Sequence, residues 1–324
     1  WRSGRTEKLS NMRNFTEFLL TAFSDDRMLQ KLCAMLLSLI YLLALTGNLL
    51  IIVLTSTTQH LQSPLYFFLR NLSFIDVCYI SVTIPNSIVN SLTSLYSISF
   101  LGCALQVFLL FVFGGTEFAL LLVMSYDRYT AICHPLHYET VMHRGSCVQM
   151  VTASWLFGGL YGALHVAGTF SVHFCEARRL PQFFCEAPSL LKLACPGESA
   201  LEYGLIIASC GLIFMCFIVM CVSYVNIFST VLKIPVSKGR VKCLSTCLPH
   251  LAVVLLFVIS GFVTYLAENV TTSSSMKALT SVFYTVLPPT VNPIIYSLRN
   301  QDLQAALGAL IAGSMSRLSI LNKM

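Results

Sequence analysis

Seven apolar stretches dominate this chain of 324 residues, and each is about long enough to cross a lipid bilayer. A membrane-spanning helix needs about 20 mostly apolar residues, because each residue advances the helix by about 1.5 Å. The stretches cover residues 32–54, 65–92, 100–133, 147–170, 200–232, 243–266 and 276–298. Charged residues make up only 10% of the chain, against about 25% in soluble domains. The sequence therefore predicts an all-α membrane protein built as a seven-transmembrane helix bundle.

The rest of the chain adds only short segments to this bundle. No internal repeat or linker divides it, so we expect residues 1–27 to form an N-terminal tail and residues 28–300 to form the bundle. Residues 301–310 carry leucines at helical spacing, which predicts a short amphipathic helix lying flat on the membrane face. This helix and a tail would fill residues 301–324.

Basic residues alone do not orient the bundle. Cytoplasmic loops usually carry an excess of lysine and arginine, but here these residues divide evenly between the two sides. The chain begins with Trp1, and Met12 is a more plausible start. Leaving out residues 1–11 removes three basic residues from the N-terminal side, which favours an N-terminus outside the cell.

Two sequons and four loop cysteines support the same orientation. Asn14 and Asn269 each begin an Asn-X-Thr glycosylation sequon, and with seven spans both fall on one side. Four cysteines lie on that side too, in loops or at the outer start of the third span, where an oxidising environment preserves disulfides: Cys103, Cys175, Cys185 and Cys195. We expect a multi-pass plasma-membrane protein with an extracellular N-terminus and a glycosylated Asn14.

The four loop cysteines allow three disulfide pairings. A bridge from Cys103, at the start of the third span, would hold the loop after the fourth span over the mouth of the bundle. A metal site at His173 and Cys175 is the competing interpretation. We favour the disulfides and expect no metal, because a disulfide would consume the thiol that a metal needs.

Five segments, in order and spacing, carry a family resemblance. Residues 124–138 read MSYDRYTAICHPLHY and resemble the olfactory receptor signature at the end of the third span. The other four are PLYFFL at 64–69, SY at 223–224, KCLSTC at 242–247 and PPTVNPIIYSLRN at 288–300. The chain thus resembles the olfactory (odorant) receptors, a rhodopsin-like (class A) branch of the G-protein-coupled receptors. The resemblance covers about residues 14–310. The pattern resembles the tetrapod-type class II, and LPHL at 248–251 points to family fourteen.

The resemblance implies a function and a set of partners. An olfactory receptor binds a small volatile odorant and couples to a heterotrimeric G protein of the stimulatory olfactory type, which raises cyclic AMP. It also implies the pairs Cys103–Cys185 and Cys175–Cys195, contact with membrane lipid, no nucleic acid and no enzyme activity. A non-olfactory chemosensory receptor of the same fold is one alternative. A small-solute transporter is another, but it would show repeated halves and broken helices. An intramembrane protease would need a catalytic motif that is not visible.

The same resemblance places a switch at the inner end of the bundle. Asp127 would restrain Arg128 at rest, and Arg128 would turn toward the G protein and Tyr224 on activation. A simpler interpretation is an ion pair that only fixes the depth of the helix, because arginine can reach water there. The remaining switch positions are Tyr129, Asn292, Pro293 and Tyr296. Pro293 removes a backbone hydrogen bond and permits a kink that Asn292 can partly satisfy.

Polar residues within the spans suggest a polar core. Asp76 and Glu117 are costly to bury, and Asn48 and Asn292 are the groups expected to face them. The core could hold a sodium ion, the one cofactor we consider, or it could be a protonated hydrogen-bonded network. His250, among apolar neighbours, is interpreted as a buried histidine with satisfied hydrogen bonds.

Positions in the outer halves of the spans predict an apolar ligand pocket with few donors, mainly Ser209 and Tyr265. No carboxylate lies near Phe111, so a neutral apolar ligand is favoured over a cationic amine. Glu202 and Glu268 are expected to be solvated near the mouth. Val258 replaces the aromatic residue that the family usually has there, so Phe257 takes part of its role. The predicted pocket residues are Phe108, Phe111, Val112, Gly115, Ala208, Ser209, Leu212, Phe257, Gly261, Phe262, Tyr265 and Val282.

Overall fold

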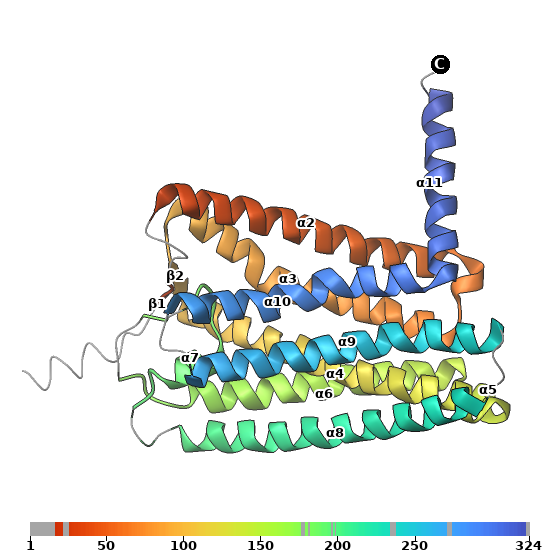
Figure 1. Ribbon diagram of the computed structural model, residues 1–324. Helices are drawn as coiled ribbons and strands as arrows, with labels where there is room; N and C mark the ends of the chain where they lie inside the picture. Colours follow the sequence, from red (N-terminus) through yellow and green to blue (C-terminus); the bar gives the residue numbers. More distant parts are fainter. Residues whose placement is uncertain are drawn as a thin grey trace, which may run out of the picture.

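Seven long helices lie side by side in the computed structural model (Figure 1). The structure describes residues 17–21, 26–175, 179–180, 182–195, 197, 199–233, 238–270 and 274–321. The predicted seven-helix bundle is confirmed. Its helices are α2 (Arg27–Thr57), α3 (Pro64–Thr93), α4 (Phe100–Cys133), α6 (Arg144–Phe170), α8 (Ala200–Lys233), α9 (Lys238–Val270) and α10 (Ser274–Arg299).

Length and composition suit these helices to a membrane. Within the described residues, α2, α3, α4, α6, α8 and residues 239–263 of α9 are long and apolar enough to cross one. Helix α10 is more polar and carries three prolines, and it packs against α2, α3 and α9 as the seventh member. Large apolar side chains cover the outer face, as on α8, where Ile207 is 72% exposed. A soluble monomer rarely exposes such a continuous apolar surface.

Short elements close the two ends of the bundle. At one end, called the disulfide end because Cys103 and Cys185 are bonded there, lie β1 (Glu17–Leu19), β2 (Ser97–Ser99) and α7 (Ala187–Leu191). At the other, called the Arg128 end, lie η1 (Gln59–Leu61), η2 (Pro135–His137) and α5 (Tyr138–Val141). Strands β1 and β2 pair antiparallel, with Phe18 opposite Ile98.

Helix α11 (Gln301–Leu321) is longer than the predicted segment 301–310 and runs across the bundle direction in Figure 1. Asn300 starts it, since the Asn300 side-chain oxygen accepts from the backbone N–H of Asp302 at 3.0 Å and of Leu303 at 3.1 Å. Tyr66 of α3 donates to the same Asn300 oxygen at 3.0 Å. The Leu303 side chain is buried, so the first turn of α11 is fixed to the bundle.

Two glycines bring α4 and α6 into close contact. Gly158 and Gly162 are spaced four apart and so share one face of α6. A Cβ atom at Gly158 would lie 2.5 Å from the carbonyl oxygen of Val112, and one at Gly162 would lie 3.0 Å from that of Phe108. Small residues at this spacing let membrane helices approach through their backbones.

A proline in α10 is accommodated by α2. Pro293 has no N–H, so the carbonyl of Pro289, one turn earlier, loses its usual helical partner. The Asn48 side-chain amide donates to this carbonyl at 2.8 Å. We predicted that Asn292 would satisfy the kink, but Asn48 does so, because it lies directly beside the freed oxygen. A Cβ atom at Gly47 would lie only 3.0 Å from the Pro293 ring, so the two helices are in close contact here.

Candidate functional site

A cavity of about 290 Å³ lies in the half of the bundle nearer the disulfide end. Aromatic and aliphatic side chains form most of its wall, and Phe118 and Phe257 close it toward the Arg128 end with ring centroids 6.0 Å apart. The lining residues are Tyr79, Val107, Leu110, Phe111, Gly114, Gly115, Phe118, Phe157, Tyr161, Glu186, Ala187, Pro188, Ser209, Leu212, Ile213, Phe257 and Tyr284. Such a volume is at the lower limit for small-molecule sites, so it suits a small ligand.

Glu186, in the loop before α7, is a cavity residue that the sequence did not reveal. Its side chain is buried and accepts hydrogen bonds from three side chains: Gln182, Ser189 at 3.3 Å and Tyr284 at 3.0 Å. Buried charge is tolerated when it is hydrogen-bonded in this way. The carboxylate therefore ties the loop to α10 across the top of the cavity.

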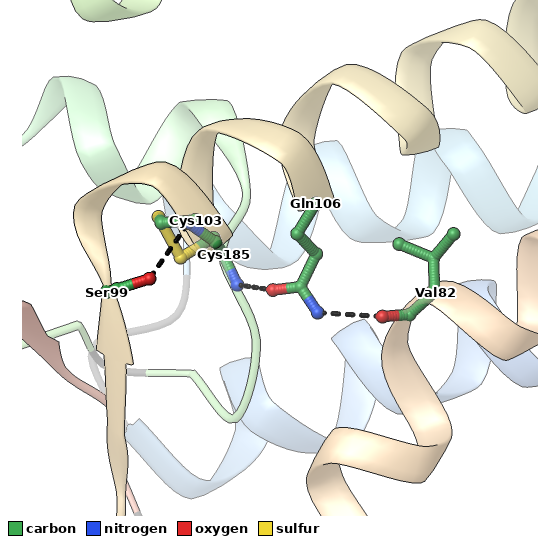
Figure 2. The surroundings of a disulfide bond; sticks show 6 residues. Val82, Ser99, Cys103, Gln106 and Cys185 are labelled. Carbon is green, nitrogen blue, oxygen red and sulfur yellow. Dashed lines mark hydrogen bonds between the residues drawn. A yellow bond between two sulfur atoms is a disulfide. The ribbon is translucent and has the colours of Figure 1, made fainter.

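A disulfide and a glutamine hold this loop over the bundle. Cys103, in the first turn of α4, is bonded to Cys185, as the family resemblance implies. Gln106, one turn further, accepts from the Cys185 backbone N–H at 2.8 Å and donates to the carbonyl of Val82 in α3 at 3.0 Å. Figure 2 shows Gln106 between these two partners. The implied pair Cys175–Cys195 is also bonded.

The chain before α2 completes this lid. Residues 17–21 were predicted as part of a tail, but they pack on the loop instead. Leu20 donates its N–H to Tyr96 at 2.8 Å, and Thr21 donates its hydroxyl to Leu180 at 2.5 Å. Phe18 is fully buried between Phe100 and Phe174. Apolar burial of Phe18 supplies the main driving force for this contact.

A buried hydrogen-bonded contact links α6 to α8 beside the cavity. His165 Nδ1 lies 2.7 Å from the Glu202 carboxylate, and His165 Nε2 lies 3.0 Å from the hydroxyl of Ser209, which lines the cavity. Glu202 is 0% exposed, so the expectation of a solvated Glu202 was wrong. It was wrong because the partner lies 37 residues away in another helix. The His165 ring also stacks on Phe111 at 4.3 Å.

Several predicted pocket residues lie on this cavity. Phe111 and Gly115 line it from α4, Ser209 and Leu212 from α8, and Phe257 from α9. Ala208 lines a smaller neighbouring cavity of about 200 Å³ between α6 and α8. The two cavities share Phe157, Tyr161, Ser209 and Leu212.

Other predicted pocket residues lie elsewhere. Phe108 and Val112 face the α4–α6 contact, because their carbonyls meet Gly162 and Gly158. Val282 packs beside a buried cluster of α2, α3 and α10. Phe262 is 61% exposed on the outer face, and the neighbouring Gly261 is exposed too. Tyr265 lies in α9, but its side chain is outside the described part of the structure. Asn14 lies outside the described residues altogether.

Asp76 and Glu117 meet at one amide in the middle of the bundle. The Asn292 side-chain nitrogen donates to Asp76 at 3.1 Å and to Glu117 at 3.4 Å. Both carboxylates are buried, and the Asn292 side-chain oxygen has no partner among the described residues. Carboxylates this close rarely ionise together, so the core needs a proton or a cation. Asn48, predicted to face these acids, bonds Pro289 instead.

Asp127 and Arg128 form a buried ion pair at the Arg128 end. The second carboxylate oxygen of Asp127 accepts from the Tyr138 hydroxyl at 2.8 Å. Burial of this phenol and the neighbouring Asp127 charge raise the pKa of Tyr138 well above its usual range, so the hydroxyl stays protonated and donates. Tyr138 lies within the receptor-like motif, but its contact with Asp127 was not anticipated.

Tyr224 and His250 form a second link near this end. His250 Nε2 lies 3.0 Å from the Leu121 carbonyl, which can only accept, so this nitrogen carries the proton. His250 Nδ1 then accepts from the Tyr224 hydroxyl at 2.5 Å. His250 is buried with both nitrogens bonded, in agreement with the interpretation from sequence.

The remaining switch positions surround these links. Tyr129 lies 3.1 Å from the ring of His134, which ends α4. Tyr296 is buried, and its hydroxyl has no partner among the described residues. Pro293 lies at the α2–α10 contact.

Comparisons with known proteins agree with one another. Residues 37–312 match the family model described as olfactory receptor. Olfactory receptor 14A16 of Homo sapiens is 52% identical over 309 residues, which are 95% of this chain and 100% of that protein. Olfactory receptor 14L1 of Homo sapiens is 51% identical over 306 residues, or 94% of each chain. The crystal structure of squid rhodopsin shares the fold, with a TM-score of 0.68 at 18% identity over 88% of this chain and 81% of that one.

Proposed function

Because the chain belongs to the olfactory receptor family, we propose that it detects a small, neutral, mostly apolar volatile and activates a stimulatory olfactory-type G protein, which raises cyclic AMP. Family and fold together make it a multi-pass membrane receptor for odorants rather than an enzyme. The observation that carries the proposed ligand class is the small, aromatic-lined cavity beneath the loop of Glu186.

Burial of apolar surface is the main source of affinity in such a cavity, at about 25 cal/mol per Å². Ser209 and Tyr161 offer hydroxyls from two walls, so a ligand with one ether, carbonyl or hydroxyl group fits the lining. Glu186 is the one carboxylate on the lining in the described part of the chain, and three donors already bond it. A cationic amine would have to displace these donors, so a neutral ligand is favoured.

The cavity and the polar core are neighbours along α4. Phe118 lines the cavity and follows Glu117, which shares the Asn292 amide with Asp76. A ligand that shifts the Phe118–Phe257 pair would therefore move α4 and α9 relative to each other at the level of these acids. The oxygens of Asp76, Glu117 and Asn292 would hold a sodium ion, whose charge would let both carboxylates ionise. Removal of sodium should then change ligand potency.

At the Arg128 end, which we place in the cytosol, activation would separate Arg128 from Asp127 and open the bundle to the G protein. The disulfide end would then face outside, with a glycan at Asn14. Arg128→Ala should reach the cell surface normally but give no cyclic AMP response. Retained signalling would remove Arg128 from the switch.

The test is a panel of volatiles on cells that contain the olfactory G protein, with cyclic AMP as the readout. The panel should include isosteric pairs, in which an alcohol and the matching amine differ in one group. We expect responses to neutral members only, and Ser209→Ala should weaken those to oxygen-bearing ligands by about tenfold, as for a lost hydrogen bond. A stronger response to amines, abolished by Glu186→Gln, would overturn the neutral ligand class.

A further inference from the structure

A groove of about 420 Å³ lies at the Arg128 end and shares no lining residue with the ligand cavity or with the switch. It is bounded by the end of α2, η1, and the first residues of α3 and α6. Arg70 of α3 and Arg144 of α6 both line it. No acidic side chain belongs to its lining among the described residues.

The local electrostatics of the groove favour an anion. The N-termini of α3 and α6 both open into it, through Ser63, Pro64 and Arg144, and helix N-termini carry partial positive charge. The N-cap residue Ser63 makes no side-chain bond to the first turn of α3. Within the described residues, neither arginine forms an ion pair with a carboxylate. Two cationic side chains and an uncapped helix start thus share one groove.

Arg70 is also positioned for this role. Its guanidinium lies 5.4 Å from the centre of the Phe67 ring, which lines the same groove. It also donates to the Ser56 hydroxyl at 3.5 Å. Stacking on an aromatic ring fixes the planar guanidinium and leaves donors for a phosphate oxygen.

Apolar surface continues from the groove toward the middle of the membrane. Phe74 follows Arg70 by one turn and is 51% exposed, and Val148 follows Arg144 by one turn and is 46% exposed. Deeper still, the Phe74 ring contacts Trp155 of α6 at 6.2 Å. A membrane lipid has the same order of groups, with charge in its headgroup and hydrocarbon below it. Neither a free anion nor a soluble protein needs an apolar surface that continues into the membrane.

We propose that this groove binds an anionic phospholipid, with the phosphate between Arg70 and Arg144 and an acyl chain along Phe74, Val148 and Trp155. The lipid would join the starts of α3 and α6 from the outside. Anionic lipids are enriched in the cytoplasmic leaflet, which matches the orientation proposed above. The binding itself does not depend on that orientation or on the odorant.

Trp155 provides a direct test, because the chain has only one other tryptophan, Trp1. The full chain with Trp1→Phe is placed in phosphatidylcholine nanodiscs that contain phosphatidylserine with brominated chains, which quench tryptophan on contact. We expect stronger quenching of Trp155 than with brominated phosphatidylcholine at the same content. Arg70→Gln and Arg144→Gln should each weaken the phosphatidylserine effect by about tenfold, as for a charged hydrogen bond. Lys233→Gln, which removes an exposed cation from the end of α8, should not.

The outcomes separate the alternatives. Equal quenching by both brominated lipids would overturn the site. An equal loss in Lys233→Gln would also overturn it, since general attraction to the basic surface would then be sufficient. Displacement by glycerol 3-phosphate at matching concentration would show a free-anion site and remove the lipid. Thermal unfolding of each variant in neutral nanodiscs checks that the fold is intact, and a conservative Arg70→Lys should recover part of the effect.

Discussion

The two ends of this receptor are held together by different kinds of bond. At the disulfide end, Cys103–Cys185, a pair of strands and the buried Phe18 fix the lid over the cavity. At the Arg128 end, the described residues show no disulfide. An apolar cluster around Ile227 and Val231 lies there beside hydrogen bonds centred on Asp127 and His250. The covalent link keeps one arrangement, whereas hydrogen bonds can be exchanged at small cost.

This difference suggests a division of labour. The proposed ligand end is preorganised. Ordering a pocket on binding costs free energy and reduces affinity, and a small ligand avoids that cost here. The proposed output end can adopt a second arrangement because its links break one by one. Substitutions at the disulfide end should therefore affect folding, and substitutions at the Arg128 end should affect signalling.

The largest effect is expected for Cys103→Ser. It opens a disulfide that joins positions 82 residues apart, and loss of a native disulfide typically costs about 2–5 kcal/mol. We expect little receptor at the cell surface by labelling of an epitope tag. Cys210→Ser, which alters a free exposed cysteine in α8, is the control and should leave the surface level unchanged. Normal expression of Cys103→Ser would contradict the tethered lid.

Asp127→Asn should have the next largest effect, at the opposite end. It removes the charge that holds Arg128, and a hydrogen bond to a charged group contributes about 1.5–3 kcal/mol. Basal cyclic AMP should rise by up to about tenfold, corrected for surface level. Asp26→Asn, at the N-cap of α2, serves as the control for loss of a carboxylate. Unchanged basal signalling would show that the pair only anchors the helix.

Tyr138→Phe should raise basal signalling less, because it removes one neutral donor from Asp127, worth about 1 kcal/mol. The raised pKa of Tyr138 adds a pH test. A phenol with a raised pKa stays protonated at every pH below its usual pKa, so its hydrogen bond contributes fully there and weakens only at higher pH. The difference between wild type and variant should therefore be constant between about pH 6.5 and 8.5. A difference that shrinks as the pH rises would argue against the assigned hydrogen bond.

Thr21→Val should have the smallest effect. Its hydroxyl donates to Leu180 in the lid, and one such bond contributes about 0.5–1.5 kcal/mol. We expect a lower unfolding temperature without any change in basal signalling. Thr93→Val is the matched control, because the Thr93 hydroxyl bonds only the backbone of Val89 and Leu95, at the end of α3. Altered signalling in Thr21→Val would mean that the lid takes part in switching.

Much of the fold followed from composition and periodicity. The third predicted span, residues 100–133, has the bounds of α4, and all seven spans match long helices. This agreement arises because a lipid-facing helix must be apolar along its length and must satisfy its own backbone. The strand pair of the lid was not predicted, because its strands are short and 80 residues separate Phe18 from Ile98.

The pocket was harder to predict than the spans. Successive helical residues are turned by about 100°, so Phe262 lies about 140° around α9 from Phe257 and faces outward. Pocket residues were predicted from their depth along the helix, and depth without this rotation does not tell which side chains face the cavity. Phe108 and Val112 were misplaced for a similar reason, because α6 takes up that face of α4. Glu186 and Glu202 carried no local signal, since their partners lie in other segments.

The glycine seam between α4 and α6 limits how this receptor can change its ligand range. Where two backbones touch at Gly158 and Gly162, no side chain is present to be trimmed or enlarged. The spacing of α4 and α6 is therefore fixed, and a change of ligand range must come from the side chains that line the cavity rather than from a shift of these two helices. Lining side chains such as Phe111, Leu212 and Phe257 can vary in bulk without separating the two glycine-packed backbones.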